Sequence, residues 1–562
     1  MSGSLVNRRI RLLLVVLVLA LGGTFLRAAW LQSVRAASLA RMADVQHRET
    51  IELPASRGTI FDRTGVQLAL GEQATTVYAD PRQVRNPRSA ALLAGRTLGV
   101  DSSRLYPKLA DRTKGFVYVA RKADPARAAL LERRHVAGFG FYPEERRSYP
   151  EGSVAAQVLG YAGLDNNGLA GLELELDRYL RGRPGSERIV KDPFGRVIDV
   201  VSERAPLEGR DAYLTIDHTV QANVEQVLRQ TVADEHAKDA TAIVLDPHTG
   251  ALLAMAVEPG YDANKFPLVP AALQRNRAVT DTYEPGSTFK LITVAGVLSD
   301  GLVTPETAFT LPYSIHVADR VVHDAEERST ERMTVAQILA RSSNVGAITL
   351  AENLGTDRLL AWIGRFGFGK RTGVDFLGES PGILPSYWSG SSIGNVPIGQ
   401  GIAVTPVQMA AAYAAIANGG VWVEPHLVDR IAGRARTRPL RRRIVSRAIA
   451  VELTTMLKDV VSSGTGTSAQ IPGYQVAGKT GTAQKPDPRG GYSTGRYVAS
   501  FVGFVPASKP RLVVLVAVDE PHRAIWGGSV AAPAFAQIAR FCLQYLAIPP
   551  DGPVFTTPTP AG

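Results

Sequence analysis

The chain has 562 residues, and its 63 Lys and Arg against 52 Asp and Glu give a formal charge of +11. This length predicts several domains, and 45% hydrophobic with 20% charged residues excludes a mostly disordered chain. It also excludes a protein with many membrane spans, because each span needs an apolar run of about 20 residues.

The positive charge is concentrated in two places. Residues 1–50 hold seven Arg against Asp44 and Glu49, and eight more Arg lie between Arg430 and Arg447. Charge that is so local does not support a nucleic-acid-binding face. We expect the second cluster to lie on an exposed hairpin.

The start of the chain has the pattern of a membrane anchor. Arg8, Arg9 and Arg11 precede the uncharged run 12–26, and a helix over 12–31 would span about 30 Å. Basic residues that precede an apolar span favour the cytoplasmic side of the membrane. Residues 1–11 are therefore expected in the cytoplasm and the residues after the span outside it. We therefore expect a single-pass protein of the plasma or inner membrane with an extracytoplasmic or periplasmic catalytic domain. A cleaved signal peptide is the alternative.

Patterns after the anchor predict a stalk, two modules and a tail. Residues 32–50 are polar, and 51–207 mixes short strand-like pieces with Gly and Pro turns. Strand-like alternation over 212–216, followed by an amphipathic helix, indicates a new domain over 208–548. The tail 549–562 is rich in Pro and Gly and is predicted to be disordered.

The first motif is Ser287-Thr288-Phe289-Lys290, which follows Glu284-Pro285-Gly286. Apolar residues recur at helical spacing after it, so Ser287 is predicted near a helix start. The spacing then places the Ser287 hydroxyl and the Lys290 amine on one helix face. Lysine activates serine only when neutral, which burial and the helix dipole both favour. Alone, the pattern S-x-x-K is also expected by chance in a chain of this length.

The second motif, Ser342-Ser343-Asn344, lies 55 residues after Ser287. It follows a predicted short helix that begins with Thr334-Val335-Ala336-Gln337, a capping-box pattern. By itself, a serine with an amide after a helix is also what an ordinary turn contains.

The third motif, Lys479-Thr480-Gly481-Thr482, lies 137 residues after Ser342, beside apolar strands predicted at 498–505 and 512–518. It overlaps a match to the nucleotide-binding P-loop pattern over 473–480. A P-loop needs a buried strand before it and a helix after it, but a Ser- and Gly-rich run precedes and Pro residues follow. We therefore predict no nucleotide site.

In this order and spacing the three motifs resemble those of penicillin-binding proteins and serine β-lactamases. Tyr283-Glu284-Pro285-Gly286 and Ile398-Gly399-Gln400-Gly401 are similar to class B penicillin-binding proteins. The stretches from Arg57 to Arg63 and from Gly168 to Glu173 resemble the non-catalytic module of that class. The resemblance extends from the anchor to about residue 548.

The resemblance implies an α+β fold. The transpeptidase domain would be like that of penicillin-binding proteins and serine β-lactamases, with an antiparallel sheet flanked by helices. An N-terminal α+β dimerisation or pedestal module would occupy 51–207, behind one transmembrane helix over 12–31.

The resemblance also implies a serine D-Ala-D-Ala transpeptidase that crosslinks peptidoglycan stem peptides. Ser287 would be the nucleophile and Lys290 its base, and the backbone N–H groups of Ser287 and Thr482 would form the oxyanion hole. The full set implied is catalytic Ser287, Lys290, Ser342 and Lys479 with substrate-binding Asn344, Thr480, Gly481 and Thr482.

Details of the motifs look most like the division-type FtsI family, which implies septal wall synthesis with a SEDS-type glycosyltransferase and divisome proteins as partners. β-Lactams would acylate the same serine. An elongation-type transpeptidase, a D,D-carboxypeptidase or a β-lactam receptor are the alternatives. The module before residue 208 is too short for a glycosyltransferase, so no such activity is expected.

No cofactor or metal is expected, because the nine His are dispersed and form no H-E-x-x-H pattern. The single cysteine, Cys542, lies in an apolar context and is predicted to be a buried, inert thiol. Thr405-Pro406-Val407-Gln408 is predicted to begin a helix with Pro in its first turn and a capping box.

Overall fold

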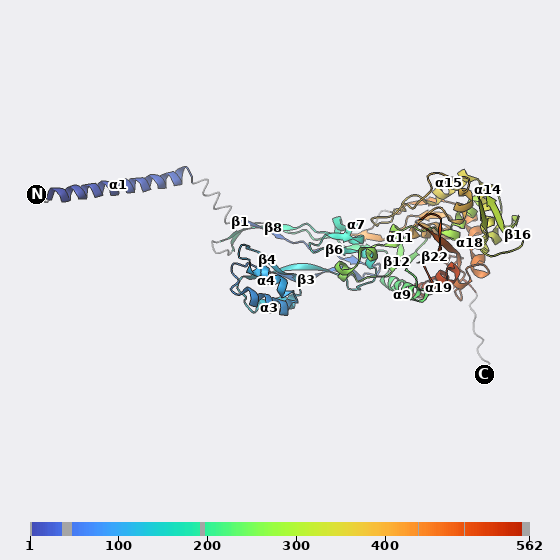
Figure 1. Cartoon of the computed structure of the whole chain (residues 1–562), viewed down its shortest axis with the longest axis horizontal. Coiled ribbons are helices and arrows are strands. Elements are labelled where there is room, and N and C mark those ends of the chain that lie inside the picture. The colour runs from blue at the N-terminus through green and yellow to red at the C-terminus, as the bar shows by residue number, and fades with distance from the viewer. Residues whose placement is uncertain (1–2, 36–47, 192–196, 436–437, 488, 553–562) are drawn as a thin grey trace, which may run out of the picture. The chain divides into compact units, whose positions relative to one another are not determined.

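The computed structural model describes residues 3–35, 48–191, 197–435, 438–487 and 489–552 (Figure 1). Contacts divide the chain into two compact units. Met1–Ser56 and Gly182–Glu208 form the first unit, and Arg57–Arg181 with Gly209–Gly562 form the second.

The first unit contains one long helix and a small sheet. Helix α1 (Gly3–Ser33) contains the predicted span, and a window within Asn7–Ser33 has a mean hydropathy of 2.3 with none of it buried. The helix is therefore long and apolar enough to cross a membrane. The antiparallel sheet has the order β1-β8-β9, with β1 (Arg48–Leu53), β8 (Gly185–Lys191) and β9 (Val197–Arg204).

The predicted stalk, 32–50, is described only at its ends. Residues 36–47 lie outside the described residues, and residues 48–50 pair in β1 instead of continuing the stalk.

The second unit begins with strands and short helices that follow residue 57. The strands are β2 (Ile60–Phe61), β3 (Gln67–Ala79), β4 (Val117–Ala123), β5 (Phe139–Ser148), β6 (Tyr161–Ala162) and β7 (Gly168–Ala170). The helices are α3 (Pro87–Leu98), α4 (Ser102–Ala110), α5 (Pro125–Glu132), α6 (Ala156–Leu159), α7 (Gly171–Glu175) and α8 (Asp177–Leu180).

One buried carboxylate joins segments of this N-terminal part. Arg57 Nε donates to Glu173 Oε2 at 2.6 Å, and Arg147 Nε donates to Glu173 Oε1 at 2.6 Å. The Glu173 side chain is fully buried. A buried carboxylate is costly unless it is paired. This ion pair therefore explains the presence of Arg57 and Glu173 in the two stretches that resemble the non-catalytic module, 57–63 and 168–173.

The rest of the second unit contains the larger domain. Its strands are β10 (Ala212–Leu214), β11 (Asp239–Leu245), β12 (Leu252–Glu258), β13 (Ala308–Leu311), β14 (Ser314–Val317), β15 (Arg320–His323), β16 (Glu331–Thr334), β17 (Val421–Val423), β18 (Val428–Ile431), β19 (Arg434–Ala435), β20 (Arg441–Arg443), β21 (Ala477–Pro486), β22 (Tyr492–Val505) and β23 (Leu512–Asp519).

Helices of this domain range from single turns to five turns. The α-helices are α9 (His218–Glu235), α10 (Ala271–Gln274), α11 (Arg277–Thr280), α12 (Lys290–Ser299), α13 (Val335–Ala340), α14 (Asn344–Leu354), α15 (Thr356–Phe366), α16 (Ser392–Asn395), α17 (Pro406–Ala417), α18 (Arg447–Ser462) and α19 (Gly527–Tyr545). The 3₁₀ helices are η1 (Ala263–Leu268), η2 (Gly286–Phe289), η3 (Val396–Ile398) and η4 (Thr467–Ala469).

A five-stranded antiparallel sheet lies at the centre of this domain, in the order β12-β11-β23-β22-β21. Side chains alternate between its faces, as the two-residue period of a strand requires. Val513 and Leu515 of β23 join the core that contains α12 and α17, whereas Val514 and Val516 join the core with α9 and α19. Helices thus cover both faces, and β21 lies at one edge.

A second, seven-stranded sheet combines strands from both sides of residue 208. Its order is β19-β18-β10-β2-β3-β4, with β5 also paired to β3. Strand β10 pairs in parallel with β2 and antiparallel with β18. The α+β architecture with a helix-flanked antiparallel sheet is confirmed, while the predicted boundaries at 51, 208 and 549 stay predictions.

Two expectations need correction. The arginines after residue 429 do not share one hairpin: Arg430 and Arg434 lie on the β18–β19 hairpin, whereas β20 pairs with β17. Residues 549–552 of the predicted disordered tail are in place, because Asp551 accepts hydrogen bonds from the Gln475 N–H and the Ser508 hydroxyl. Residues 553–562 lie outside the described residues.

Candidate active site

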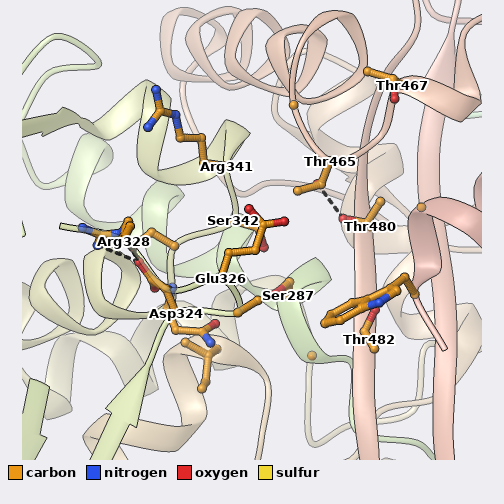
Figure 2. Close-up of a pocket in the computed structure, with 18 of the residues that line it drawn as sticks. Ser287, Asp324, Glu326, Arg328, Arg341, Ser342, Thr465, Thr467, Thr480 and Thr482 are labelled. Carbon is orange, nitrogen blue, oxygen red and sulfur yellow. Dashed lines mark hydrogen bonds and ion pairs between the residues drawn. The ribbon is translucent and has the colours of Figure 1, made fainter. Parts of the chain in front are cut away.

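The three sequence motifs line one cavity of about 790 Å³ (Figure 2). Ser287 lies between two walls, one formed by the segment around Ser342 and the other by the edge strand β21. Figure 2 shows Thr480 and Thr482 on β21, across the cavity from Ser342. Lys290 and Lys479 are completely buried behind this surface.

Ser287 lies in η2, directly before α12, as its sequence context predicts. Gly286 has a φ of +54°, a conformation that favours glycine, and its N–H donates to the Gly399 carbonyl at 3.1 Å. The helix that follows is buried along almost its whole length, which fixes the position of the serine. The Ser287 hydroxyl donates to no described residue and so faces the cavity without a partner.

Lys290 contacts the second motif. Its Nζ donates to the Ser342 carbonyl at 2.5 Å, to the Asn344 Oδ1 at 2.7 Å and to the Ser342 hydroxyl at 3.2 Å. Burial lowers the pKa of Lys290 to about 7, against the opposing charge of Asp324. A substantial fraction of this amine is therefore neutral near pH 7, as a base requires.

The second motif connects two helices. Helix α13 begins with the predicted capping box of Thr334 and Gln337. Ser342 has a φ of +61°, which is uncommon for a residue with a side chain, and this turn directs its carbonyl to Lys290. Ser343 then caps α14 by accepting the Gly346 N–H at 2.9 Å.

Asp324 holds the start of α14 in place. Its Oδ1 accepts the N–H groups of Asn344 at 2.6 Å and Val345 at 3.0 Å, and the Ser343 hydroxyl also donates to its carboxylate. A negative charge at the N-terminus of a helix is stabilising. Asp324 therefore fixes the motif that contacts Lys290.

The third motif lies within the edge strand β21. Lys479 Nζ donates to the carbonyl and the hydroxyl of Thr480, each at 3.2 Å. Burial, followed by the nearby charge of Lys290, lowers the pKa of Lys479 well below its usual value. The hydroxyls of Thr480 and Thr465 lie 2.7 Å apart (Figure 2), and the Thr482 hydroxyl accepts the Gly527 N–H at 3.0 Å.

Gly481 lets the strand approach the serine segment. A side chain on Gly481 would begin 2.4 Å from the Ser500 hydroxyl oxygen and 2.8 Å from the Pro285 carbonyl oxygen. These separations are too short for non-bonded contact, so the site in this form requires glycine here.

The structure also bears on the other sequence interpretations. Residues 477–486 form the strand β21, so a strand lies where a P-loop has the start of a helix. Cys542 is buried, as predicted, and burial raises the pKa of its thiol to about 12. The capping box of Thr405 and Gln408 on α17 is confirmed as well.

One group of potential metal ligands occurs among the described residues, away from this cavity. Asp62, Asp217 and His218 have ligand atoms within 4.8 Å of one another. Asp62 Oδ2 lies 2.7 Å from His218 Nδ1, and Asp217 accepts the N–H groups at the start of α9. Both carboxylates thus have structural partners. The expectation of no metal site stays a prediction.

Sequence reasoning missed several residues at the cavity, among them Asp324 and Thr465, and also Gly527, whose N–H donates to Thr482. Asp324 lies in the stretch 307–330, which contains no recognisable motif, and its partners in the second motif are 19 to 21 residues away. Thr465 belongs to a Ser- and Gly-rich run that indicated only irregular structure. Trp526-Gly527-Gly528 carried one usable signal, since glycine is a poor helix former and two glycines begin α19.

Comparison with known proteins gives two family matches. Residues 240–540 match the penicillin binding protein transpeptidase domain, and residues 52–214 match the penicillin-binding protein dimerisation domain. A transpeptidase domain that follows a dimerisation domain defines class B of the penicillin-binding proteins. The chain belongs to this family of D,D-transpeptidases.

Similarity to individual proteins covers almost the whole chain. The chain is 32% identical to peptidoglycan D,D-transpeptidase FtsI of Escherichia coli K12, over 97% of this chain and 93% of that protein. It is 35% identical to penicillin-binding protein PbpB of Mycolicibacterium smegmatis, over 97% and 91%. The crystal structure of penicillin binding protein 3 from Mycobacterium tuberculosis with aztreonam has a TM-score of 0.72 and 31% identity, over 91% of this chain and all of that one.

Replacing Gly481 tests the close approach of β21 to the serine segment. We expect Gly481→Ala to lower the free energy of unfolding by about 1–3 kcal/mol, because the added methyl group overpacks this contact. Thermal unfolding measures the loss. Gly495→Ala on β22 is the matched control, since nothing lies within 4 Å of a side chain there. Equal melting temperatures for the two variants would contradict the prediction.

Proposed function

We propose that the protein crosslinks peptidoglycan stem peptides through an acyl-enzyme on Ser287. The observation that carries this proposal is that one cavity is lined by an unpartnered serine hydroxyl and by Ser342, which contacts the buried amine of Lys290, and that burial lowers the pKa of this amine to about 7. Membership in the penicillin-binding transpeptidases and the likeness to a structure solved with aztreonam support it.

In the acylation step, Ser287 Oγ attacks the carbonyl carbon of the penultimate D-alanine of a donor peptide. The hydroxyl proton passes to neutral Lys290 Nζ as the Oγ–C bond forms. The peptide C–N bond then breaks, and the proton reaches the leaving nitrogen through the Ser342 hydroxyl, 3.2 Å from Lys290 Nζ. D-Alanine leaves, and the donor remains as an ester on Ser287.

The donor is held by the edge strand and by the second motif. Lys479, with Thr480 and Thr482, binds the terminal carboxylate, whose charge raises the lowered pKa of Lys479 and keeps this lysine protonated. Asn344 binds the donor's peptide amide. Among the strands that the structure describes, β21 pairs only with β22. The donor's backbone would therefore bind along the other edge of β21.

The N–H groups of Ser287 and Thr482 stabilise the oxyanion of the tetrahedral intermediate. Two preorganised N–H groups of this kind are typically worth about 10²–10³ each in rate. An amine from a second stem peptide then attacks the ester and restores the Ser287 hydroxyl. A D,D-carboxypeptidase, which uses water at this step, and a β-lactam receptor are the alternative functions.

We further propose that residues 12–31 anchor the protein in the membrane with residues 1–11 in the cytoplasm, because three arginines precede the apolar run. Septal synthesis is the favoured role, since FtsI and the mycobacterial PbpB proteins are among its relatives. A SEDS-type glycosyltransferase and divisome proteins would then be partners, and the chain itself would make no glycan. An elongation role is the alternative.

Removing the nucleophile tests the chemistry. We expect Ser287→Ala to unfold at the same temperature as the parent protein and to lose all covalent labelling by a fluorescent penicillin, because no acyl-enzyme forms. Labelled bands after denaturing electrophoresis provide the measurement. Ser463→Ala is the control, since Ser463 is exposed on the same cavity and should label normally. Undiminished labelling of Ser287→Ala would disprove the assignment.

The pH dependence of acylation tests the role of Lys290. Lysine acts as a base only above its pKa, and burial lowers that pKa to about 7. We therefore expect the acylation rate to rise about tenfold per pH unit below neutrality and to level off above it. Stopped-flow measurement with a chromogenic cephalosporin gives the profile. A rate that does not change between acid and neutral pH, in protein that remains folded, would rule out this base.

Depletion in the host distinguishes the two cellular roles. We expect cells that lose the protein to grow as filaments, because septal crosslinking stops while elongation continues. Microscopy after repression of the gene shows the outcome, and re-expression of the parent chain, but not of Ser287→Ala, should restore division. Rounded cells would instead indicate an elongation role.

A further inference from the structure

The active-site cavity has walls of different charge. On the β21 side the lining is formed by hydroxyls, with the amine of Lys479 buried behind them. On the opposite side lie four carboxylates and two guanidinium groups, which leave that wall with an excess of negative charge: Asp324, Glu326, Glu327 and Glu331 with Arg328 and Arg341. A transpeptidase must bind two peptides whose reacting ends differ in charge, a donor with a carboxylate and an acceptor with an ammonium group.

Glu326 is a free carboxylate on the acidic side. Figure 2 shows its side chain pointing into the cavity, on the side of Ser342. It is exposed, and it forms no hydrogen bond or ion pair with any residue that the structure describes. Asp324 and Glu331 on the same wall differ from it, since Asp324 forms an ion pair with Arg328 at 2.6 Å and Glu331 forms one with Arg341 at 2.9 Å. Glu327, the next residue, also lines the cavity as an exposed carboxylate without an ion pair to any described residue, and adds to the negative charge around Glu326.

The loop that carries Glu326 is held at both ends. Asp324 accepts two backbone N–H groups of α14, as described above, and Arg328 donates to the carbonyls of Leu311 at 2.8 Å and Pro312 at 2.9 Å. Asp324 and Arg328 are also bonded to each other. Glu326 therefore lies midway along a short loop that is attached to the same helix as Asn344.

We propose that Glu326 binds the ammonium group of the acceptor stem peptide and holds it on the Ser342 side of the acyl-enzyme. This inference rests on the proposed transpeptidase function. Binding there places the acceptor nitrogen opposite the wall that holds the donor's carboxylate, so both peptides fit in one cavity. Glu326 thus determines which nucleophile reaches the ester.

The acceptor nitrogen loses two of its three protons during transfer. The acceptor nitrogen enters with three protons, and one is released to solvent before attack. The nitrogen then forms a bond with the ester carbon while the C–Oγ bond of Ser287 breaks. A second proton passes through Lys290 to Ser287 Oγ, and the third remains on the new amide. Water competes for the same ester and carries no charge for Glu326 to attract.

Partition of the acyl-enzyme between amine and water tests the proposal in the full-length chain in detergent. The donor is a D-Ala-D-Ala peptide, and the acceptors are a cationic amino-acid amide and hydroxylamine, which is uncharged at neutral pH. We expect Glu326→Gln to lower transfer to the cationic acceptor about five- to tenfold, through a higher KM for that acceptor. Penicillin acylation and transfer to hydroxylamine should change less than twofold.

Three further measurements make the result specific. Glu326→Lys should reduce cationic transfer more than Glu326→Gln, Glu326→Asp should restore part of it, and added salt should weaken transfer only where the carboxylate is present. Glu306→Gln, an exposed change outside the cavity, is the matched control.

Each outcome decides a different question. If Glu326→Gln leaves the partition of the acyl-enzyme between amine and water unchanged, the proposal is overturned. It is also overturned if penicillin acylation falls as much as transfer to the cationic acceptor, because the residue would then support Ser287 rather than the acceptor. If the parent protein neither acylates nor transfers, the proposed function itself fails.

Discussion

Two buried lysines set the main constraint on this site. Lys290 and Lys479 are completely buried, and the charge of Lys290 lowers the pKa of Lys479 further. Lowering the pKa of Lys290 to about 7 costs the folded chain roughly 4 kcal/mol at pH 7 relative to an exposed lysine. Because this penalty disappears only above the usual lysine pKa, the surrounding core has to offset it throughout the neutral range.

The packing around the lysines explains several local features that otherwise look unrelated. Ser342 adopts a left-handed conformation and thereby offers its carbonyl to Lys290. Asp324 fixes the start of α14, and its negative charge opposes the fall in the pKa of Lys290. Gly481 allows β21 to lie against the serine segment. Each feature positions a polar group without letting solvent reach the amines.

The sequence alone was enough to locate residues that interact with neighbours only three or four positions away. The positions of Ser287 and Lys290 follow from helical periodicity, and the capping boxes of α13 and α17 are read directly from four-residue patterns. Asp324 and Glu326 lie in a stretch without periodicity, and only the folded chain brings them to the cavity. The arginine cluster was misassigned to one hairpin because charge density carries no information on strand pairing.

The seven-stranded sheet links the two family domains in a way that limits how they can be separated. Strand β10 lies between β2, from before residue 182, and β18, from the larger domain. A chain truncated to start at Gly209 would retain β10 but lose its parallel neighbour. Its unpaired backbone would then become an exposed sheet edge, a common starting point for aggregation. The two domains match separate families, but in the folded chain the backbone hydrogen bonds of one sheet join them.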